Sequence, residues 1–260
     1  VLRGPGLSKM VSDTDPKSPQ KPLEECKPLD NSPEAKKTAE VVNELTKLFR
    51  EVLEHHPINR ERAEAGLPPA NAVLFRGAGT LPRLDPLSSQ YGISFAAIVP
   101  TALIKGVAIA AGMKYIPVEG ATGTTKTDVM AKARAAVDAL KRYDFVFVHV
   151  KGTDNASHDG DYRTKMEMIE RIDEMVGFIS SKISGDDYLA LTADHTTGTR
   201  ARKHLGDPVP VAIYGAEVRV DDVRSYSERS CAKGGLCRIR GVDLMPILMN
   251  YVDRGRKFGA

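Results

Sequence analysis

Long apolar runs are missing from this 260-residue sequence. No stretch approaches the roughly 20 consecutive apolar residues that a transmembrane helix needs, which excludes a helical membrane span. The apolar, charged, glycine and proline fractions are ordinary for a globular protein. A chain of this length can bury a sizeable core, either as one large domain or as one domain and part of another.

An excess of charge of one sign is also missing. The 37 basic and 34 acidic residues leave a net charge of +3 and are interleaved along the chain. Nucleic-acid binding calls for a basic stripe or patch, so this class of function is excluded. The mild basicity is compatible with a small anionic substrate.

Cysteine is scarce. Cys26, Cys231 and Cys237 are odd in number and show no paired C-x-x-C spacing. This pattern argues against a disulfide framework and against a thiolate zinc site. We therefore expect three reduced thiols in a cytoplasmic protein.

The first third of the chain has few signals of regular structure. Val1 and Leu2 resemble the middle of a strand, and residues 3–32 predict an extended loop because they are rich in Pro, Ser, Lys and Asp. Ser32-Pro33-Glu34 then predicts a helix start, and apolar residues at helical spacing continue until His56-Pro57. Residues 70–75 predict a short strand that runs into a glycine and proline loop.

Strands and helices alternate from Gly92 onward. Apolar runs of strand length occur at 93–100, 114–118, 144–150, 188–193 and 209–214, and helical patterns occur at 101–113, 128–140 and 163–183. Strands that are apolar on both faces and alternate with helices predict an α/β fold whose sheet is at least partly parallel and is covered by helices on both sides. We place a domain boundary near residue 88.

Polar residues follow two of these strands. Ligands of open α/β sheets gather beyond the carboxyl ends of the strands. Asp154 and His158 follow the run at 144–150, and a carboxylate and an imidazole in this spacing can turn toward one ion such as Mn²⁺, Zn²⁺ or Mg²⁺. We expect both residues in a loop.

Three further residues extend this candidate site. Asp194 and His195 follow the run at 188–193, and neighbouring side chains of an extended chain point to different sides, so this pair is better placed to serve two ions. His204 lies on a predicted loop and could complete a site. Two divalent ions typically clamp a phosphoryl group, which makes a phosphate ester the leading substrate class.

Each of these Asp, His and Lys residues could also have an ordinary structural role instead of binding a metal or substrate. A single Asp or His after a strand is more often a cap or turn former, and only the five together favour a metal site. We expect His149 to be a hydrogen-bonded core histidine, and Asp159 and Asp161 to cap the helix near Arg163. Lys151 is either a surface lysine or a phosphate contact.

Several segments together resemble one enzyme family. "GTDNASHDG", "TADHTT", "KHLGDPVPV", "LFRGAG", "VPTALIKGVAIAAGM" and "ERSCAKGGLCRIRGVDLMPILMNYV" resemble the cofactor-independent phosphoglycerate mutases, most closely the archaeal type. The resemblance implies the core of the alkaline phosphatase superfamily. It also implies interconversion of 2-phosphoglycerate and 3-phosphoglycerate through a phosphoserine enzyme. The cofactors would be two divalent ions, Mn²⁺ or Mg²⁺ first and Zn²⁺ or Co²⁺ as further options.

The resemblance also implies roles for individual residues. Asp154, His158 and His204 would hold one ion, and Asp194 and His195 would hold the other. The substrate phosphate or carboxylate would contact three basic residues: Lys105, Lys151 and Arg76.

One part of the family pattern has no match here. Family members carry an N-terminal aspartate that binds the second ion and a serine that takes the phosphoryl group, and no segment matches either. Ser8, Ser12 and Ser18 lie in the first loop and are not candidate nucleophiles. We therefore expect a C-terminal portion that is nearly inactive alone, with the tail of an inserted substrate-handling domain at 1–88 and most of the phosphatase-like core at 89–260.

Two alternatives remain open. Another enzyme of the superfamily, such as a phosphatase or phosphopentomutase, would keep the same ligands and change the substrate pocket. A non-catalytic module, in which one ion only staples the sheet, would need no substrate at all.

Overall fold

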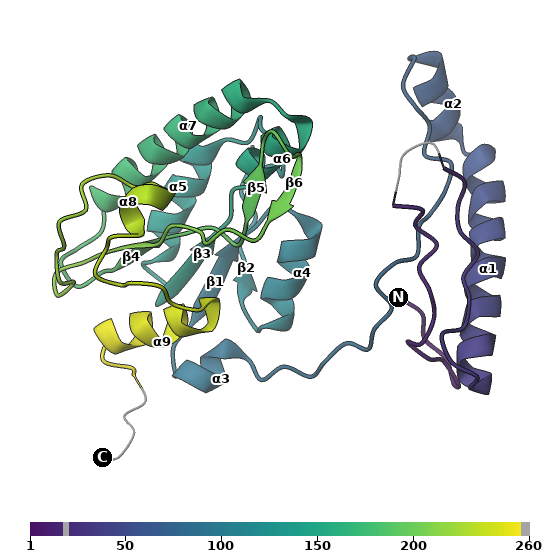
Figure 1. Cartoon of the computed structure of the whole chain (residues 1–260), viewed down its shortest axis with the longest axis horizontal. Coiled ribbons are helices and arrows are strands. Elements are labelled where there is room, and N and C mark those ends of the chain that lie inside the picture. Colours follow the sequence, from purple (N-terminus) through teal and green to yellow (C-terminus); the bar gives the residue numbers. More distant parts are fainter. Residues whose placement is uncertain (18–20, 256–260) are drawn as a thin grey trace. The chain divides into compact units, whose positions relative to one another are not determined.

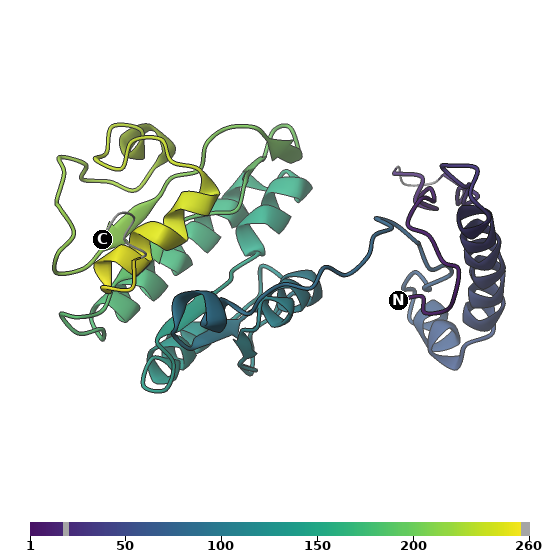
Figure 2. The ribbon, with the colours of Figure 1, turned by 90° about the horizontal axis from the view of Figure 1, so that it is seen from below.

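The computed structural model describes residues 1–17 and 21–255. The chain divides into two compact units, Val1–Arg83 and Leu84–Ala260, and each is described by itself (Figures 1 and 2). None of the helices in the described part combines the length and apolar content that crossing a bilayer requires. All three cysteines are free thiols.

The first unit is built around one long helix, α1 (Pro33–Glu54). The Oγ of Ser32 accepts a hydrogen bond from the backbone N–H of Ala35 at 3.2 Å, and Pro33 occupies the first helical position. The helix ends at Glu54 with His55 as its C-cap, and α2 (Pro57–Glu64) follows closely. The predicted start and end of the first helix are confirmed.

The extended first segment is held to α1 by side-chain hydrogen bonds. Asn43 pairs with both backbone groups of Cys26, accepting from its N–H at 2.9 Å and donating to its carbonyl oxygen at 3.0 Å. The fully buried Thr14 donates its backbone N–H to the carbonyl oxygen of Phe75 at 2.8 Å. A small core forms where these segments meet, from Val11, Cys26, Ala39 and Val42 with Phe75 packed against them.

Two strands predicted for the first unit are wrong. Val1–Leu2 and residues 70–75 have no strand assignment in the described part of the chain. A strand needs a series of backbone hydrogen bonds to a neighbouring strand. Here the carbonyl oxygen of Phe75 accepts from the backbone of Thr14, but its N–H donates to the side chain of Thr14. The apolar face of α1 is also partly uncovered, since Leu48 and Val52 are exposed while Val42 is buried.

The second unit contains a parallel sheet in the order β2-β1-β3. Its strands are β1 (Phe95–Ile98), β2 (Lys114–Tyr115) and β3 (Phe145–Val148). The register of β1 and β3 runs from Phe95 opposite Phe145 to Ile98 opposite Val148. Every residue of β1 is buried, as expected for a central strand covered on both faces.

Helices cover both faces of this sheet. On one face α4 (Ala102–Ala110) packs Ala108 against a cluster that includes Phe147. On the other, α5 (Val129–Ala139) and α7 (Tyr162–Ser180) lie side by side and pack against Val148 (Figure 1). Successive strand residues point to opposite faces, so Phe147 and Val148 contact different helix layers. The predicted α/β fold with a parallel sheet is confirmed.

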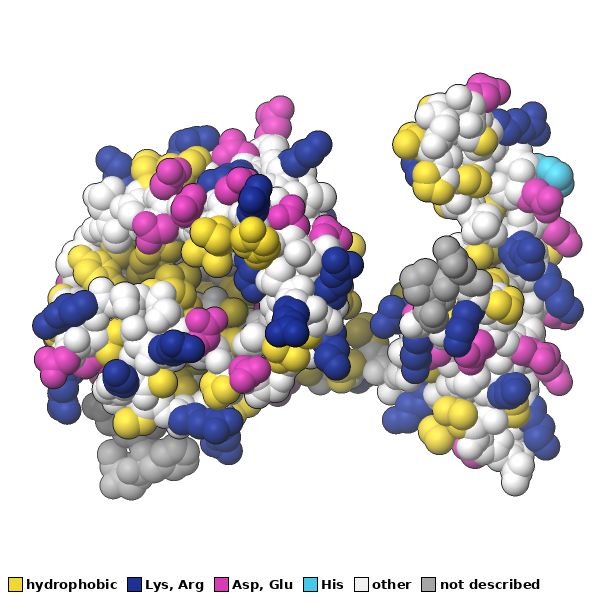
Figure 3. Space-filling model, turned by 45° about the horizontal axis from the view of Figure 1, so that its top comes forward, with side chains coloured by type: hydrophobic (Ala, Val, Ile, Leu, Met, Phe, Trp, Pro, Cys, Tyr) yellow, Lys and Arg dark blue, Asp and Glu magenta, His cyan; other side chains and the backbone are white. Residues whose placement is uncertain are grey.

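The remaining strands pair apart from the parallel sheet. Among the described residues, β4 (Leu189–Leu191) pairs only with β7 (Ala212–Tyr214), and β5 (Thr196–Gly198) pairs only with β6 (Lys203–Leu205), both antiparallel. The other helices are α3 (Leu87–Tyr91), α8 (Glu228–Cys231) and α9 (Gly241–Tyr251). On the face in Figure 3, basic and acidic side chains are interspersed over each unit.

One lysine is buried beneath the carboxyl edge of the sheet. Lys132 of α5 is fully buried, and its Nζ donates to the carbonyl oxygen of His149 at 3.0 Å. Burial lowers the pKa of Lys132 to about 8. Burial also lowers the pKa of His149. The Nδ1 of His149 has no hydrogen-bond partner in the described part of the chain, so the prediction of a hydrogen-bonded core histidine is wrong for this atom.

Candidate metal centre

Asp154 and His158 lie on a short helix, α6 (Gly152–Asp159), directly after β3. The loop predicted for these residues is therefore wrong. Residues four apart lie on the same face of a helix, so α6 itself turns both side chains toward one point. An acidic residue in the first turn and a glycine after the last are sequence signals that could have indicated this helix.

Glycines at both ends of α6 allow its position. A Cβ on Gly152 would lie 2.6 Å from the Cε of Met168, so a larger residue here would require the buried side chain of Met168 on α7 to move. Gly160 follows the helix with a φ of +76°, the left-handed conformation common after a helix. Asp161, not Asp159, caps α7 by accepting from the backbone N–H of Thr164 at 3.0 Å. The capping role predicted for Asp159 is wrong because Asp159 is the last residue of α6.

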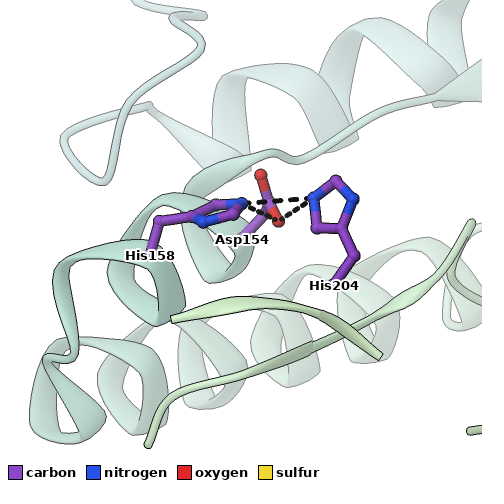
Figure 4. A group of neighbouring side chains, drawn as sticks. All are labelled: Asp154, His158 and His204. Carbon is purple, nitrogen blue, oxygen red and sulfur yellow. Dashed lines mark hydrogen bonds and ion pairs between the residues drawn. The ribbon is translucent and has the colours of Figure 1, made fainter. Parts of the chain in front are cut away.

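The hairpin of β5 and β6 brings His204 to the same point. His204 is the central residue of β6 and pairs with Thr197, so its predicted loop position is wrong. Its Nε2 lies 3.2 Å from the Nε2 of His158 and 3.6 Å from the Oδ1 of Asp154 (Figure 4). The Nε2 of His158 lies 3.4 Å from the same Oδ1.

These distances fit a single divalent ion. Metal bonds of about 2.0–2.2 Å in tetrahedral or octahedral geometry place two ligand atoms about 2.8–3.6 Å apart. One ligand atom from each of Asp154, His158 and His204 lies within 4.8 Å of the others. The carboxylate is largely shielded, while both imidazoles are exposed. The three residues thus form a partly open cluster suited to a bound ion.

A backbone contact sets the tautomer of the His158 imidazole. Its Nδ1 lies 3.1 Å from the carbonyl oxygen of Arg202, which can only accept a hydrogen bond. In the neutral imidazole the hydrogen therefore lies on Nδ1 and the lone pair lies on Nε2. A metal-binding histidine commonly has its other nitrogen held in this way.

The carboxylate of Asp154 is held on both oxygens. Burial raises its pKa, but hydrogen bonds from Lys151 and Thr197 outweigh this effect, and the pKa falls to about 2. Lys151 donates to Oδ2, and the Oγ1 of Thr197 donates to Oδ1 at 2.6 Å. Asp154 therefore stays ionised at neutral pH and presents Oδ1 to the two imidazoles.

Asp194 and His195 lie between β4 and β5, beside this cluster. The Oδ2 of Asp194 is 3.4 Å from the Nε2 of His195, so the predicted divergence of the two side chains is wrong. The rings of His195 and His204 lie with centroids 3.8 Å apart. Both Asp194 and His195 line a cleft of about 1400 Å³, which is bounded by β7 and residues 217–241.

The basic residues predicted at the site are distributed differently. Lys151 forms an ion pair with Asp154, directly beside the cluster. The Nζ of Lys105, on α4, lies 3.6 Å from the ring centroid of Tyr115. Arg76 belongs to the first unit, where it is mostly exposed and pairs with Asp15 at 3.2 Å. Of the two lysines, which both belong to the second unit, the structure brings Lys151 next to the three clustered residues.

Comparisons with known proteins agree with a metal site. The sequence model of a family described as the Metalloenzyme superfamily matches residues 27–251. The whole chain is 51% identical to 2,3-bisphosphoglycerate-independent phosphoglycerate mutase 1 of Methanocaldococcus jannaschii and covers 64% of that protein. It is 50% identical, again over its whole length, to a mutase of the same description from Ignicoccus hospitalis, of which it covers 62%.

Two solved structures are also similar. One, of a protein from Pyrococcus horikoshii, matches 88% of this chain and 60% of its own with a TM-score of 0.80 at 46% identity. The other is a cofactor-independent phosphoglycerate mutase from Thermoplasma acidophilum. The match covers 96% of this chain and 61% of that protein, with a TM-score of 0.61 at 32% identity. The family match spans most of the chain, including all of the clustered residues. The chain belongs to the Metalloenzyme superfamily.

Proposed function

We propose that this chain supplies the metal-binding core of a cofactor-independent phosphoglycerate mutase, which interconverts 2-phosphoglycerate and 3-phosphoglycerate. The supporting observation is the meeting of Asp154, His158 and His204 in a chain that is 51% identical, over its whole length, to a protein named as such a mutase. The chain spans 64% of that relative's length, so the activity is proposed for the complete protein. Its place would be glycolysis and gluconeogenesis in the cytoplasm.

The candidate ligands divide into two groups. Asp154, His158 and His204 would hold one divalent ion, and Asp194 with His195 would contribute to a second. Carboxylate and imidazole ligands suit Mn²⁺ or Mg²⁺ first, with Zn²⁺ and Co²⁺ as further options. Bound there, the ions would neutralise charge on a phosphoryl group.

The protein's own groups prepare this site. Lys151 occupies Oδ2 of Asp154, which leaves Oδ1 directed at the imidazoles of His158 and His204. The ammonium group of Lys151 also places a positive charge where the phosphate of the substrate would approach. Lys105 and Arg76 are proposed as further contacts of the substrate phosphate or carboxylate.

We also propose a division of roles along the chain. Residues 1–88 would be the tail of an inserted substrate-handling domain, and residues 89–260 would form most of the phosphatase-like core. The nucleophilic serine and a further aspartate for the second ion would come from a segment not among these 260 residues. The separate compact unit at Val1–Arg83 supports this division.

The complete protein that contains these 260 residues offers the test. We expect Mn²⁺-dependent conversion of 3-phosphoglycerate to 2-phosphoglycerate in an enolase-coupled assay, and nearly none from the 260 residues alone. Asp154→Asn should reduce kcat at least about 100-fold, because the ligand loses its charge. Asp159→Asn, an exposed change on the same helix, is the matched control and should keep the activity.

Other outcomes would contradict the proposal. Hydrolysis of general phosphate esters without phosphoglycerate turnover would indicate a phosphatase of the same superfamily. Tight metal binding with no activity on either class would indicate a non-catalytic module.

A further inference from the structure

We propose that Thr197 is a positioning residue that joins the two candidate ligand groups, because its one hydroxyl orients the carboxylate of Asp154 and sets the tautomer of His195. This inference adds a residue to the proposed metal centre, and it rests on the proposed function for the identity of the metal ligands. Sequence reasoning did not single out Thr197, which is the third threonine and last residue of "TADHTT".

Thr197 contacts members of both groups. Its Oγ1 lies 2.6 Å from the Oδ1 of Asp154 and 3.1 Å from the Nδ1 of His195. Its partner in the hairpin register is His204. One buried residue, 5% exposed, thus contacts or pairs with three of the five candidate ligands.

The directions of these two hydrogen bonds follow from the chemistry of the groups. A threonine hydroxyl has one hydrogen to donate, and a carboxylate can only accept. The hydroxyl therefore donates to Asp154 and must accept from His195. In neutral His195 the hydrogen then lies on Nδ1, which leaves the lone pair on Nε2.

The consequence concerns the second ligand group. The Nε2 of His195 lies 3.4 Å from the Oδ2 of Asp194. Two lone-pair atoms at this distance repel one another, but they can share a cation. The hydroxyl of Thr197 thereby keeps Asp194 and His195 in a form that favours an ion over a direct hydrogen bond.

The hydroxyl is held firmly in place. Thr197 is the central residue of β5, and the Nζ of Lys165 on α7 donates to its carbonyl oxygen at 3.0 Å. The side chain is buried, so water has little access to replace the hydroxyl. The neighbouring Thr196 instead donates to the carbonyl oxygen of Asp207 at 3.3 Å, away from the ligands.

Three variants separate positioning from packing. Thr197→Val keeps the shape and removes the hydroxyl, Thr197→Ser keeps the hydroxyl, and Thr196→Val removes a hydroxyl hydrogen bond from the same strand. Nitrogen-15 NMR of the histidine rings, in metal-free protein at pH 8, reports the tautomer of His195. Calorimetric titration with Mn²⁺ reports binding, and circular dichroism checks folding.

We expect an Nδ1–H tautomer for His195 in the native chain, in Thr197→Ser and in Thr196→Val. Thr197→Val should lose this preference and weaken Mn²⁺ binding by about 10–100-fold, the usual effect of removing a group that orients a metal ligand. An Nε2–H tautomer in the native chain would overturn the inference without any variant. So would native-like Mn²⁺ binding by Thr197→Val, or an equal loss in Thr196→Val. The tautomer is read without substrate or metal, so failure of the mutase proposal would be seen separately.

Discussion

The Nε2 atoms of His158 and His204 lie 3.2 Å apart although the residues are 46 positions apart in the sequence. The carbonyl oxygen of Arg202 holds the Nδ1 hydrogen of His158, so in the metal-free chain the hydrogen between the two rings must belong to His204. A bound ion would take the place of that hydrogen. The two rings are therefore already spaced as two ligands of one ion would be, and binding would require the hydrogen to leave the Nε2 of His204.

Removing one imidazole should remove most of the metal affinity. We expect His204→Ala to weaken Mn²⁺ binding by more than about 100-fold, because loss of a ligand exceeds the 10–100-fold effect of losing a supporting group. Isothermal titration calorimetry measures this. His55→Ala, which removes an imidazole from the first unit, is the control and should bind Mn²⁺ as the native chain does. Equal binding by His204→Ala would contradict the assignment.

A methyl group at Gly160 should disturb the site from outside it. A Cβ there would lie 2.8 Å from Nη2 and 2.9 Å from Cζ of Arg202, whose carbonyl oxygen holds His158. We expect Gly160→Ala to lose about 1–2 kcal/mol of unfolding free energy from the left-handed backbone, and also to weaken Mn²⁺ binding.

Gly66→Ala is the matched control for this change. Gly66 has a φ of +69° and no atom within 4 Å of its would-be Cβ. Gly66→Ala should therefore lose stability only through the left-handed backbone, without a side-chain clash. Urea denaturation should show similar losses for both variants, while calorimetry should show weaker Mn²⁺ binding only for Gly160→Ala. Unchanged binding in Gly160→Ala would mean that the Arg202 side chain moves aside without displacing the carbonyl oxygen that contacts His158.

The buried Lys132 should make stability depend on pH. Burial lowers its pKa to about 8 from 10.5, so between these values the unfolded chain holds a proton that the folded chain has released. Its contribution to the unfolding free energy therefore rises as the pH rises through this window. Below pH 8 the buried charge is a constant cost.

Lys132→Met removes this titration. From pH 7 to pH 9.5 we expect the native chain to gain about 1–2 kcal/mol of unfolding free energy relative to this variant. Urea denaturation of both chains at each pH provides the comparison. Parallel pH profiles would show that the lysine titrates normally in the folded state.

Asn43 should be important for the stability of the first unit. Its amide satisfies both the N–H and the carbonyl oxygen of Cys26, so Asn43→Ala leaves two backbone groups without their partner. We expect a loss of about 1–3 kcal/mol of unfolding free energy in urea denaturation. Glu44→Ala, an exposed change on the same helix, should be nearly neutral. Equal stability of the two variants would show that this pairing contributes little.

Short-range patterns predicted most elements of the second unit. The apolar run around Phe95 and the alternation after it predicted β1, α4, α5, β3 and α7, and Ser32-Pro33 predicted the start of α1. Such signals are local, because caps and apolar periodicity act within a few turns or residues. The same signals were wrong at residues 70–75, where no partner strand is available among the described residues.

The residues of the candidate centre could be named from their chemistry, but their geometry could not. Asp154 and His158 share a point because α6 forms and packs on α7 through Gly152, and His204 reaches it because the β5–β6 hairpin folds over α6. The role of Thr197 depends on two contacts of 2.6 and 3.1 Å, one of them to a residue 43 positions away. Contacts between distant segments depend on packing of the whole unit, and no local pattern of residues encodes their distances.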